Sequence, residues 1–148
     1  MISPEILRRC HYFAGLNEES LKAIAMIAEE KRVPAGQRMF HEGDPATHLY
    51  VIQHGEVSIQ YLLGDGTLRT VDTLVDGDLL VWSALIEPYK MTAIGTATKD
   101  TRLVAVAAPK LRELCEKDPL LGYRLTAQVA KMLAHRLENA RVQLAAVG

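Results

Sequence analysis

Glycine recurs at short intervals through the middle of this chain and separates runs that are too short to be helices. The glycines are Gly36, Gly43, Gly55, Gly64, Gly66, Gly77 and Gly95. Between them the runs alternate or are β-branched, and Val57, Ile59 and Tyr61 would share one face of a strand. Strands fit residues 39–40, 49–52, 57–61, 71–75, 92–98 and 102–106. Short strands at this spacing predict a double-stranded β-helix, a jelly-roll-like β-roll that also protects its edges.

Helical periodicity appears at the two ends of the chain. The pair Ser3-Pro4 suits a helix start, and Asn17 suits the cap of a second helix. Near the other end, Asp118-Pro119 begins a long helix. We therefore expect one domain over 1–148, mainly β, with flanking helices. Its expected parts are N-terminal helices in 1–30, the roll in 31–107 and C-terminal helices in 109–145.

The long C-terminal helix has two apolar strips, and one roll needs only one of them. The first strip holds Leu125, Val129 and Met132. The second recurs at steps of three and four residues and consists of Ala130, Leu133, Leu137, Ala140 and Leu144. Both strips could pack on the same roll as one wide face, or the second could pair with its copy in a symmetric dimer. Because the helix extends past the roll, we expect a homodimer through the second strip.

Charge and cysteine content exclude several classes of protein. With 17 basic and 18 acidic residues among 148, the chain has no broad attraction for nucleic acid or anionic membranes, so an anion must be bound locally. Cys10 and Cys115 lie far apart, without metal-binding spacing, and fit reduced thiols. The N-terminus does not have the pattern of a secretory signal, and no apolar run approaches a membrane span. We expect a soluble, cytoplasmic protein that does not bind membranes.

Glycine and apolar residues form an ordered skeleton along the chain. It consists of Phe13-Ala14-Gly15-Leu16, Val33-Pro34-Ala35-Gly36-Gln37, Phe40-His41-Glu42-Gly43-Asp44, Leu49-Tyr50-Val51-Ile52, Gly55-Glu56-Val57 and Gly77-Asp78-Leu79. In order and spacing this skeleton resembles the cyclic nucleotide-binding domain of the catabolite activator protein superfamily, over nearly the whole chain. The resemblance implies that residues 77–93 form the ligand-binding cassette, with one helical turn in a loop.

The cassette departs from the family's pattern at two positions. A typical member has Gly-Glu-x-Ala-Leu, in which the Glu holds the ribose 2′-hydroxyl and backbone N–H groups hold the cyclic phosphate. Here Ala84 and Leu85 match, whereas Val81 takes the Gly position and Trp82 the Glu position. Losing a hydrogen bond to a charged group costs about 1.5 to 3 kcal/mol, or roughly ten- to a hundredfold in affinity. The resemblance therefore implies weak binding of cyclic AMP or cyclic GMP, or binding of another small anion.

Further candidate ligand contacts lie around and after the short helix. The family binds phosphate with an Arg after a Pro, and Lys90 after Pro88 keeps the charge without the two-pronged guanidinium. Ser83 caps the turn or donates to a ligand, and the N–H groups around 83–85 are expected to be free. Trp82 either fills the sugar slot or offers a face for stacking. The predicted ligand-binding residues are Gly77, Trp82, Ser83, Ala84, Leu85, Lys90, Met91 and Thr92.

Three classes of function remain. The first is a non-catalytic regulatory sensor that binds a small ligand and signals to a protein partner through its C-terminal helix. The second is a ligand-independent dimerisation or interaction module with a blocked pocket. The third is a cupin-like metal enzyme using His41, His48 and His54.

The enzyme reading has little support in the sequence. The cupin His-x-His pair is absent, and no other catalytic motif appears, so we expect no enzyme activity, metal or cofactor. Family regulators carry a helix-turn-helix domain after the long helix. Because this sequence ends soon after that helix, we expect no direct DNA binding.

Overall fold

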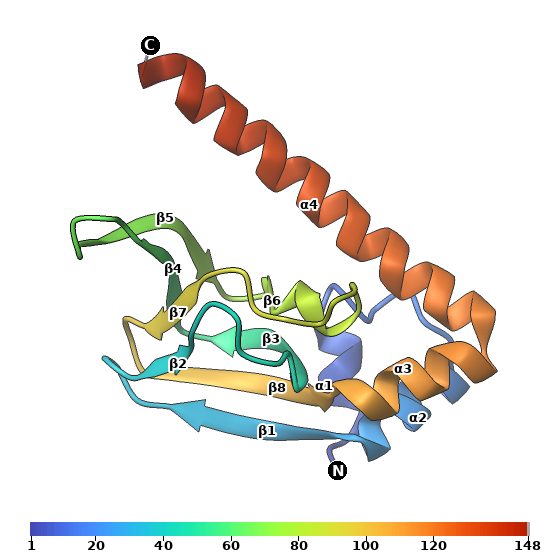
Figure 1. Ribbon diagram of the computed structural model, residues 1–148. Coiled ribbons are helices and arrows are strands. Elements are labelled where there is room, and N and C mark those ends of the chain that lie inside the picture. Colours follow the sequence, from blue (N-terminus) through green and yellow to red (C-terminus); the bar gives the residue numbers. More distant parts are fainter. Residues whose placement is uncertain (148) are drawn as a thin grey trace.

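The computed structural model describes residues 1–147 and contains two four-stranded antiparallel sheets (Figure 1). The shorter α-helices lie at one end of the sheets, and the long C-terminal helix starts at that end and runs past them. The strands are β1 (Ala28–Val33), β2 (Arg38–Phe40), β3 (His48–His54), β4 (Glu56–Leu62), β5 (Leu68–Val75), β6 (Leu79–Leu80), β7 (Ile94–Ala97) and β8 (Thr101–Ala107). The helices are α1 (Pro4–Arg9), α2 (Glu18–Met26), the 3₁₀ turn η1 (Trp82–Ala84), α3 (Ala108–Lys117) and α4 (Pro119–Val147). The sheet orders are β1-β8-β3-β6 and β2-β7-β4-β5. The predicted roll with flanking helices is confirmed.

Strand β8 lies in the middle of its sheet and is buried on both faces. It pairs with β1 on one side and with β3 on the other. Leu103, Val104 and Val106 are completely buried, and they belong to one hydrophobic cluster with the helical residue Ile24 and with Phe13. A continuous apolar run is typical of a strand covered on both sides. The helices are therefore part of the same core as the roll.

The helices begin where the capping residues predicted. Ser3 Oγ accepts a hydrogen bond from the Glu5 amide at 3.2 Å, and Asn17 Oδ1 accepts one from the Ser20 amide at 2.8 Å. Asp118 Oδ1 accepts from the Leu121 amide at 3.2 Å at the start of α4. Each oxygen satisfies a backbone donor that the first turn of a helix leaves without a partner.

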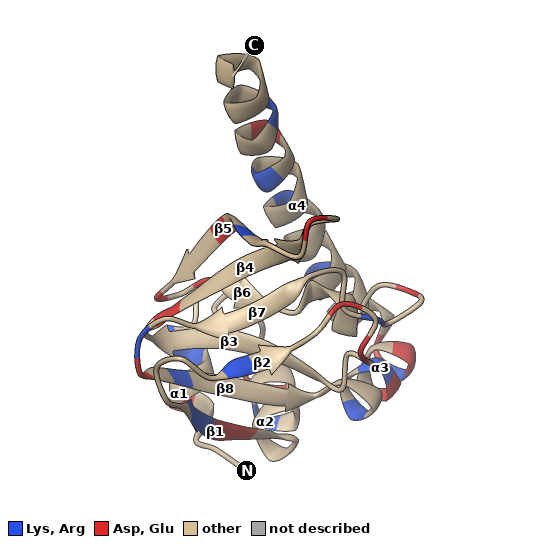
Figure 2. Cartoon of the chain, turned by 60° about the vertical axis from the view of Figure 1, so that its left-hand side comes forward, with Lys and Arg blue, Asp and Glu red and all other residues tan. Residues whose placement is uncertain are grey.

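Several element boundaries differ from the sequence prediction; β7, for example, is Ile94–Ala97 rather than 92–98. The N-terminal helical region ends at Met26 rather than near residue 30, because Ala28–Val33 forms β1 and pairs along β8. The interior of β1 is charged and exposed, with both signs side by side in Figure 2, so it carries no alternating apolar signal. The helical turn expected in a loop of the cassette is the 3₁₀ turn η1, at 82–84.

The two apolar strips of α4 have different surroundings. Leu125 and Val129 of the first strip are buried against the core, and Met132 packs beside them. In the second strip Leu133 is partly buried, whereas Leu137 is 52% exposed. Ala130, Ala140 and Leu144 are also exposed. Figure 1 shows the outer half of α4 extending away from the roll. The strips therefore do not form one wide buried face.

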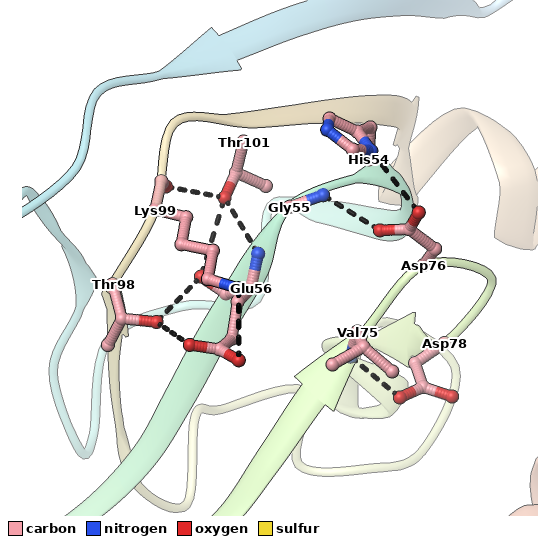
Figure 3. A network of polar contacts seen from close by, with 9 residues as sticks. All are labelled: His54, Gly55, Glu56, Val75, Asp76, Asp78, Thr98, Lys99 and Thr101. Carbon is pink, nitrogen blue, oxygen red and sulfur yellow. Dashed lines mark hydrogen bonds and ion pairs between the residues drawn. The ribbon is translucent and has the colours of Figure 1, made fainter.

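A polar network fixes the turn between β3 and β4 to the start of β8 (Figure 3). Gly55 has a φ of 130° and donates its N–H to Asp76 Oδ1 at 2.8 Å. A Cβ at Gly55 would lie 2.7 Å from the Thr101 Cα, closer than real side chains approach a backbone. The Glu56 amide donates to Thr101 Oγ1 at 3.2 Å, and Thr101 Oγ1 donates to the Lys99 carbonyl at 2.8 Å. Glycine is therefore required at position 55 by both backbone angle and space.

Replacing Gly55 tests this requirement. Gly55→Ala should lower the free energy of unfolding by about 2–4 kcal/mol, since backbone strain and the clash with Thr101 add. Gly64→Ala is the matched control, because Gly64 has nothing within 4 Å of an added Cβ and no positive φ. Urea unfolding should show a change below about 0.5 kcal/mol for the control. Similar losses for both variants would contradict the proposed role of Gly55.

Candidate functional site

A cavity of about 790 Å³ lies between the roll and helix α4. Its walls come from strands of both sheets, from the cassette and from the segment before β7. They also include the part of α4 between residues 133 and 143. The volume falls in the range of small-molecule sites, and the lining mixes apolar and polar side chains. The cavity is therefore the candidate ligand site.

The cassette forms one side of this cavity. The Gly77 amide donates to the Ile52 carbonyl at 2.7 Å, and Leu79 and Leu80 then pair with β3 as β6. Val81 follows with a φ of 67°, in the left-handed region that β-branched residues rarely adopt. This backbone shape explains why the family pattern has glycine at that position. The chain then enters η1, which carries Trp82 and Ser83 into the cavity wall.

The structure brings half of the predicted ligand-binding residues to the cavity. Trp82, Ser83, Met91 and Thr92 line it. The other four do not. Ala84 is completely buried, Leu85 packs against the core, Gly77 lies in the turn before β6, and Lys90 is exposed. The Lys90 backbone forms a bridge with Pro45 while the next residue, Met91, is buried. Which of these residues bind a ligand stays a prediction.

The expectation of free N–H groups around 83–85 was wrong for two residues. The Ala84 amide donates to the Val81 carbonyl at 3.3 Å, and the Leu85 amide donates to the Trp82 carbonyl at 3.1 Å. The turn is a 3₁₀ helix, in which bonds close over three residues and use these donors internally. An anion would therefore find fewer backbone donors than the sequence suggested.

A family model supports the interpretation of this geometry. The model described as the cyclic nucleotide-binding domain matches residues 30–118, which run from β1 through the cassette to the end of α3. This chain belongs to the cyclic nucleotide-binding domain family.

Relatives with solved structures share the arrangement. A crystal structure from Geobacter metallireducens, classed as a cyclic nucleotide-binding protein, is 39% identical with a TM-score of 0.84, over 93% of this chain and 99% of that one. The Thermus thermophilus Catabolite Activator Protein is 27% identical with a TM-score of 0.71, over 98% of this chain and 63% of that one.

A curated relative extends beyond the region matched. The CRP-like cAMP-activated global transcriptional regulator of Mycobacterium tuberculosis is 26% identical over 141 residues. The match covers 95% of this chain and 61% of the relative. This cyclic nucleotide-binding domain thus spans about three fifths of the regulator's length.

Two arginines that sequence reasoning missed hold the cassette of this cyclic nucleotide-binding domain. Arg136 on α4 donates to the Leu79 carbonyl at 2.8 Å and lines the cavity. Arg112 on α3 donates to the Ala84 carbonyl at 2.7 Å, and its guanidinium lies 4.0 Å from the centre of the Tyr89 ring. The sequence does place Arg136 on the buried side of α4, because position 136 continues the three- and four-residue spacing of Val129 and Met132.

Nearby carboxylates partly offset the effect of burial on the Arg136 guanidinium. Arg136 Nε lies 4.0 Å from Asp72 Oδ2, and the Arg136 side chain is 23% exposed. Burial lowers the pKa of Arg136, while Asp72 and Asp78 act in the opposite direction. Arginine keeps its charge in proteins in spite of such shifts. The cavity wall therefore contains a positive guanidinium.

Trp82 and the histidines bear on the alternatives. Trp82 is partly buried. Its side chain packs against the core on one side and lines the cavity on the other. His54 pairs with Asp76 at 3.2 Å, and the His48 ring stacks on Tyr50. Within residues 1–147 no three His, Cys, Asp or Glu side chains gather as a metal site. No helix in this range is long and apolar enough to span a membrane.

The strained position in the cassette gives a stability prediction. Val81→Gly should change the free energy of unfolding by less than about 1 kcal/mol, since released backbone strain offsets the lost burial. Val51→Gly is the matched control, because Val51 is fully buried in β3 and lies in a regular strand. In urea unfolding, Val51→Gly should lower the free energy of unfolding by about 2–4 kcal/mol. Equal losses would show that Val81 carries no strain.

Proposed function

We propose that this domain is a non-catalytic regulatory sensor. A small ligand occupies the cavity, and α4 carries the signal to a protein partner. The observation that supports this most is the shared wall. Trp82, Ser83 and Thr92 lie on the roll side, while Leu133 and Asn139 come from α4. A ligand that contacts both sides with different affinity in two arrangements shifts the equilibrium between them.

The ligand we propose is a cyclic nucleotide bound weakly, cyclic AMP or cyclic GMP, or a different small anion. Family membership and the similarity to the cAMP-activated mycobacterial regulator support a cyclic nucleotide. Trp82 in place of the ribose-binding Glu argues for low affinity, because it cannot accept a hydrogen bond from the sugar hydroxyl. The exposed Lys90 gives phosphate no fixed partner at the cavity wall. Weak binding suits a sensor that responds to high concentrations.

A second function is favoured by the exposed strip on α4. Leu137 and Leu144 are 52% and 75% exposed, Ala130 and Ala140 are also exposed, and Leu133 on the same strip is partly buried. Apolar residues at this spacing suit a seam with a second copy of the chain, so the domain forms a homodimer through α4. In this version the pocket is blocked by Trp82, and dimerisation or docking is independent of ligand. The site of action in both cases is the cytoplasm.

Calorimetry with cyclic AMP and cyclic GMP separates the two functions. Trp82→Glu restores a carboxylate for the ribose and should tighten binding at least about tenfold. Trp82→Gln is the matched control, because glutamine has nearly the same size as glutamate but no charge. It should give a smaller gain in nucleotide affinity. No heat with either nucleotide at millimolar concentration, in wild type and in Trp82→Glu, would favour the blocked module.

Sedimentation tests the dimer. Leu137→Glu with Leu144→Glu places two charges in the proposed seam and should convert the dimer to a monomer at tens of micromolar protein. Lys131→Glu also adds a carboxylate on α4 but at an exposed position outside the strip, and it should leave the dimer intact. A monomeric wild-type protein at the same concentration would contradict the proposed seam.

A further inference from the structure

A polar side chain on α4, Arg136, attaches the helix to the roll beyond its buried apolar residues. The buried residues of α4 are Leu121, Leu125 and Val129. Beyond them Met132 and Leu133 are still partly buried against the core. After Leu133 the helix becomes exposed, and Leu137 is 52% exposed. Arg136 interrupts this trend, since its side chain is only 23% exposed and points to the roll.

Arg136 joins three parts of the site. Its Nη2 donates to the Leu79 carbonyl on β6 at 2.8 Å, and its Nε lies 4.0 Å from the Asp72 carboxylate on β5. Leu79 lies two residues before the strained Val81, so the guanidinium is attached to the start of the cassette. Among the cavity-lining residues of the described chain, Arg136 is the single lysine or arginine. An anion in the cavity would meet this guanidinium.

A second arginine provides the contrast. Arg112 holds the far end of the same segment through the Ala84 carbonyl at 2.7 Å, and it also stacks on Tyr89. Arg112 does not line the cavity, so an occupant would leave its contacts in place. Arg136 faces the cavity, and its ion pair with Asp72 is long and partly exposed, which makes that pair weak. A ligand in the cavity could therefore displace the contacts of Arg136 more easily than those of Arg112.

We infer that Arg136, rather than Lys90, is the cation that meets the ligand, and that it acts as a latch on α4. An anionic group in the cavity takes the guanidinium from Asp72 and from the Leu79 carbonyl, and the outer half of α4 is released from the cassette. Phosphate and carboxylate groups compete well, because they accept two parallel hydrogen bonds from one guanidinium. The inference rests on the proposed function in one respect, that the ligand binds in this cavity.

Hydrogen exchange without ligand tests the latch by itself. Arg136→Gln removes the charge and should speed amide exchange in residues 133–143 by about tenfold, the effect of losing one charge-assisted hydrogen bond. Lys131→Gln, on an exposed position of the same helix, should leave exchange unchanged. Asp72→Asn should give a smaller increase in the exchange rate of residues 133–143. This second variant keeps the test available if Arg136→Gln does not fold. Wild-type exchange rates in both Arg136→Gln and Asp72→Asn would overturn the latch.

Cyclic AMP is the probe for the second half of the inference. In the wild type, saturation with cyclic AMP should speed exchange in 133–143 as Arg136→Gln does. In Arg136→Gln it should produce no further change, and its affinity should fall about tenfold, with Lys90→Ala close to wild type. An undiminished response in Arg136→Gln, or loss of binding in Lys90→Ala alone, would overturn the assignment. If the wild type binds no cyclic AMP at millimolar concentration, the nucleotide proposal fails, and the ligand-free exchange still decides the latch.

Discussion

Strand β8 has neither a free edge nor a free face, and the rest of the molecule is arranged around it. Its backbone pairs with β1 and β3, and Leu103, Val104 and Val106 are completely buried. Covering this strand requires the helices at both ends of the chain, which explains why they share its core. The other sheet ends in β5, which is largely exposed. The cavity adjoins this less covered sheet, where movement costs less packing.

The position of α4 follows from the same division. Its first half completes the core through Leu125 and Val129, which are almost completely buried. Its second half runs past the cavity with an exposed apolar face. The buried inner half and the exposed outer half of α4 therefore differ in their packing, and the outer half can move with less loss of apolar contact.

Local signals made most of the fold predictable. Glycine turns, the caps at Ser3 and Asn17, and the Asp118-Pro119 helix start act over a few residues and can be seen in the sequence. Strand β1 was missed because its charged residues become a strand only through pairing with β8. The same limit applied to the site. Arg136 and Leu79 are 57 positions apart, and the exposed position of Lys90 depends on the bridge of its backbone to Pro45. Such contacts are set by the fold and have no local pattern.

Both cassette arginines bind main-chain carbonyl oxygens, at Leu79 and Ala84. Every amino acid provides that oxygen, so the attachment of the helices does not depend on which side chains lie between the two points. Val81 and Trp82, which stand at the positions of the family's glycine and glutamate, lie inside this interval, between the two attachments. What the pocket recognises and how the pocket is coupled to its helices are thus separable properties. A cassette attached in this way can change its side chains without changing its attachment to the helices.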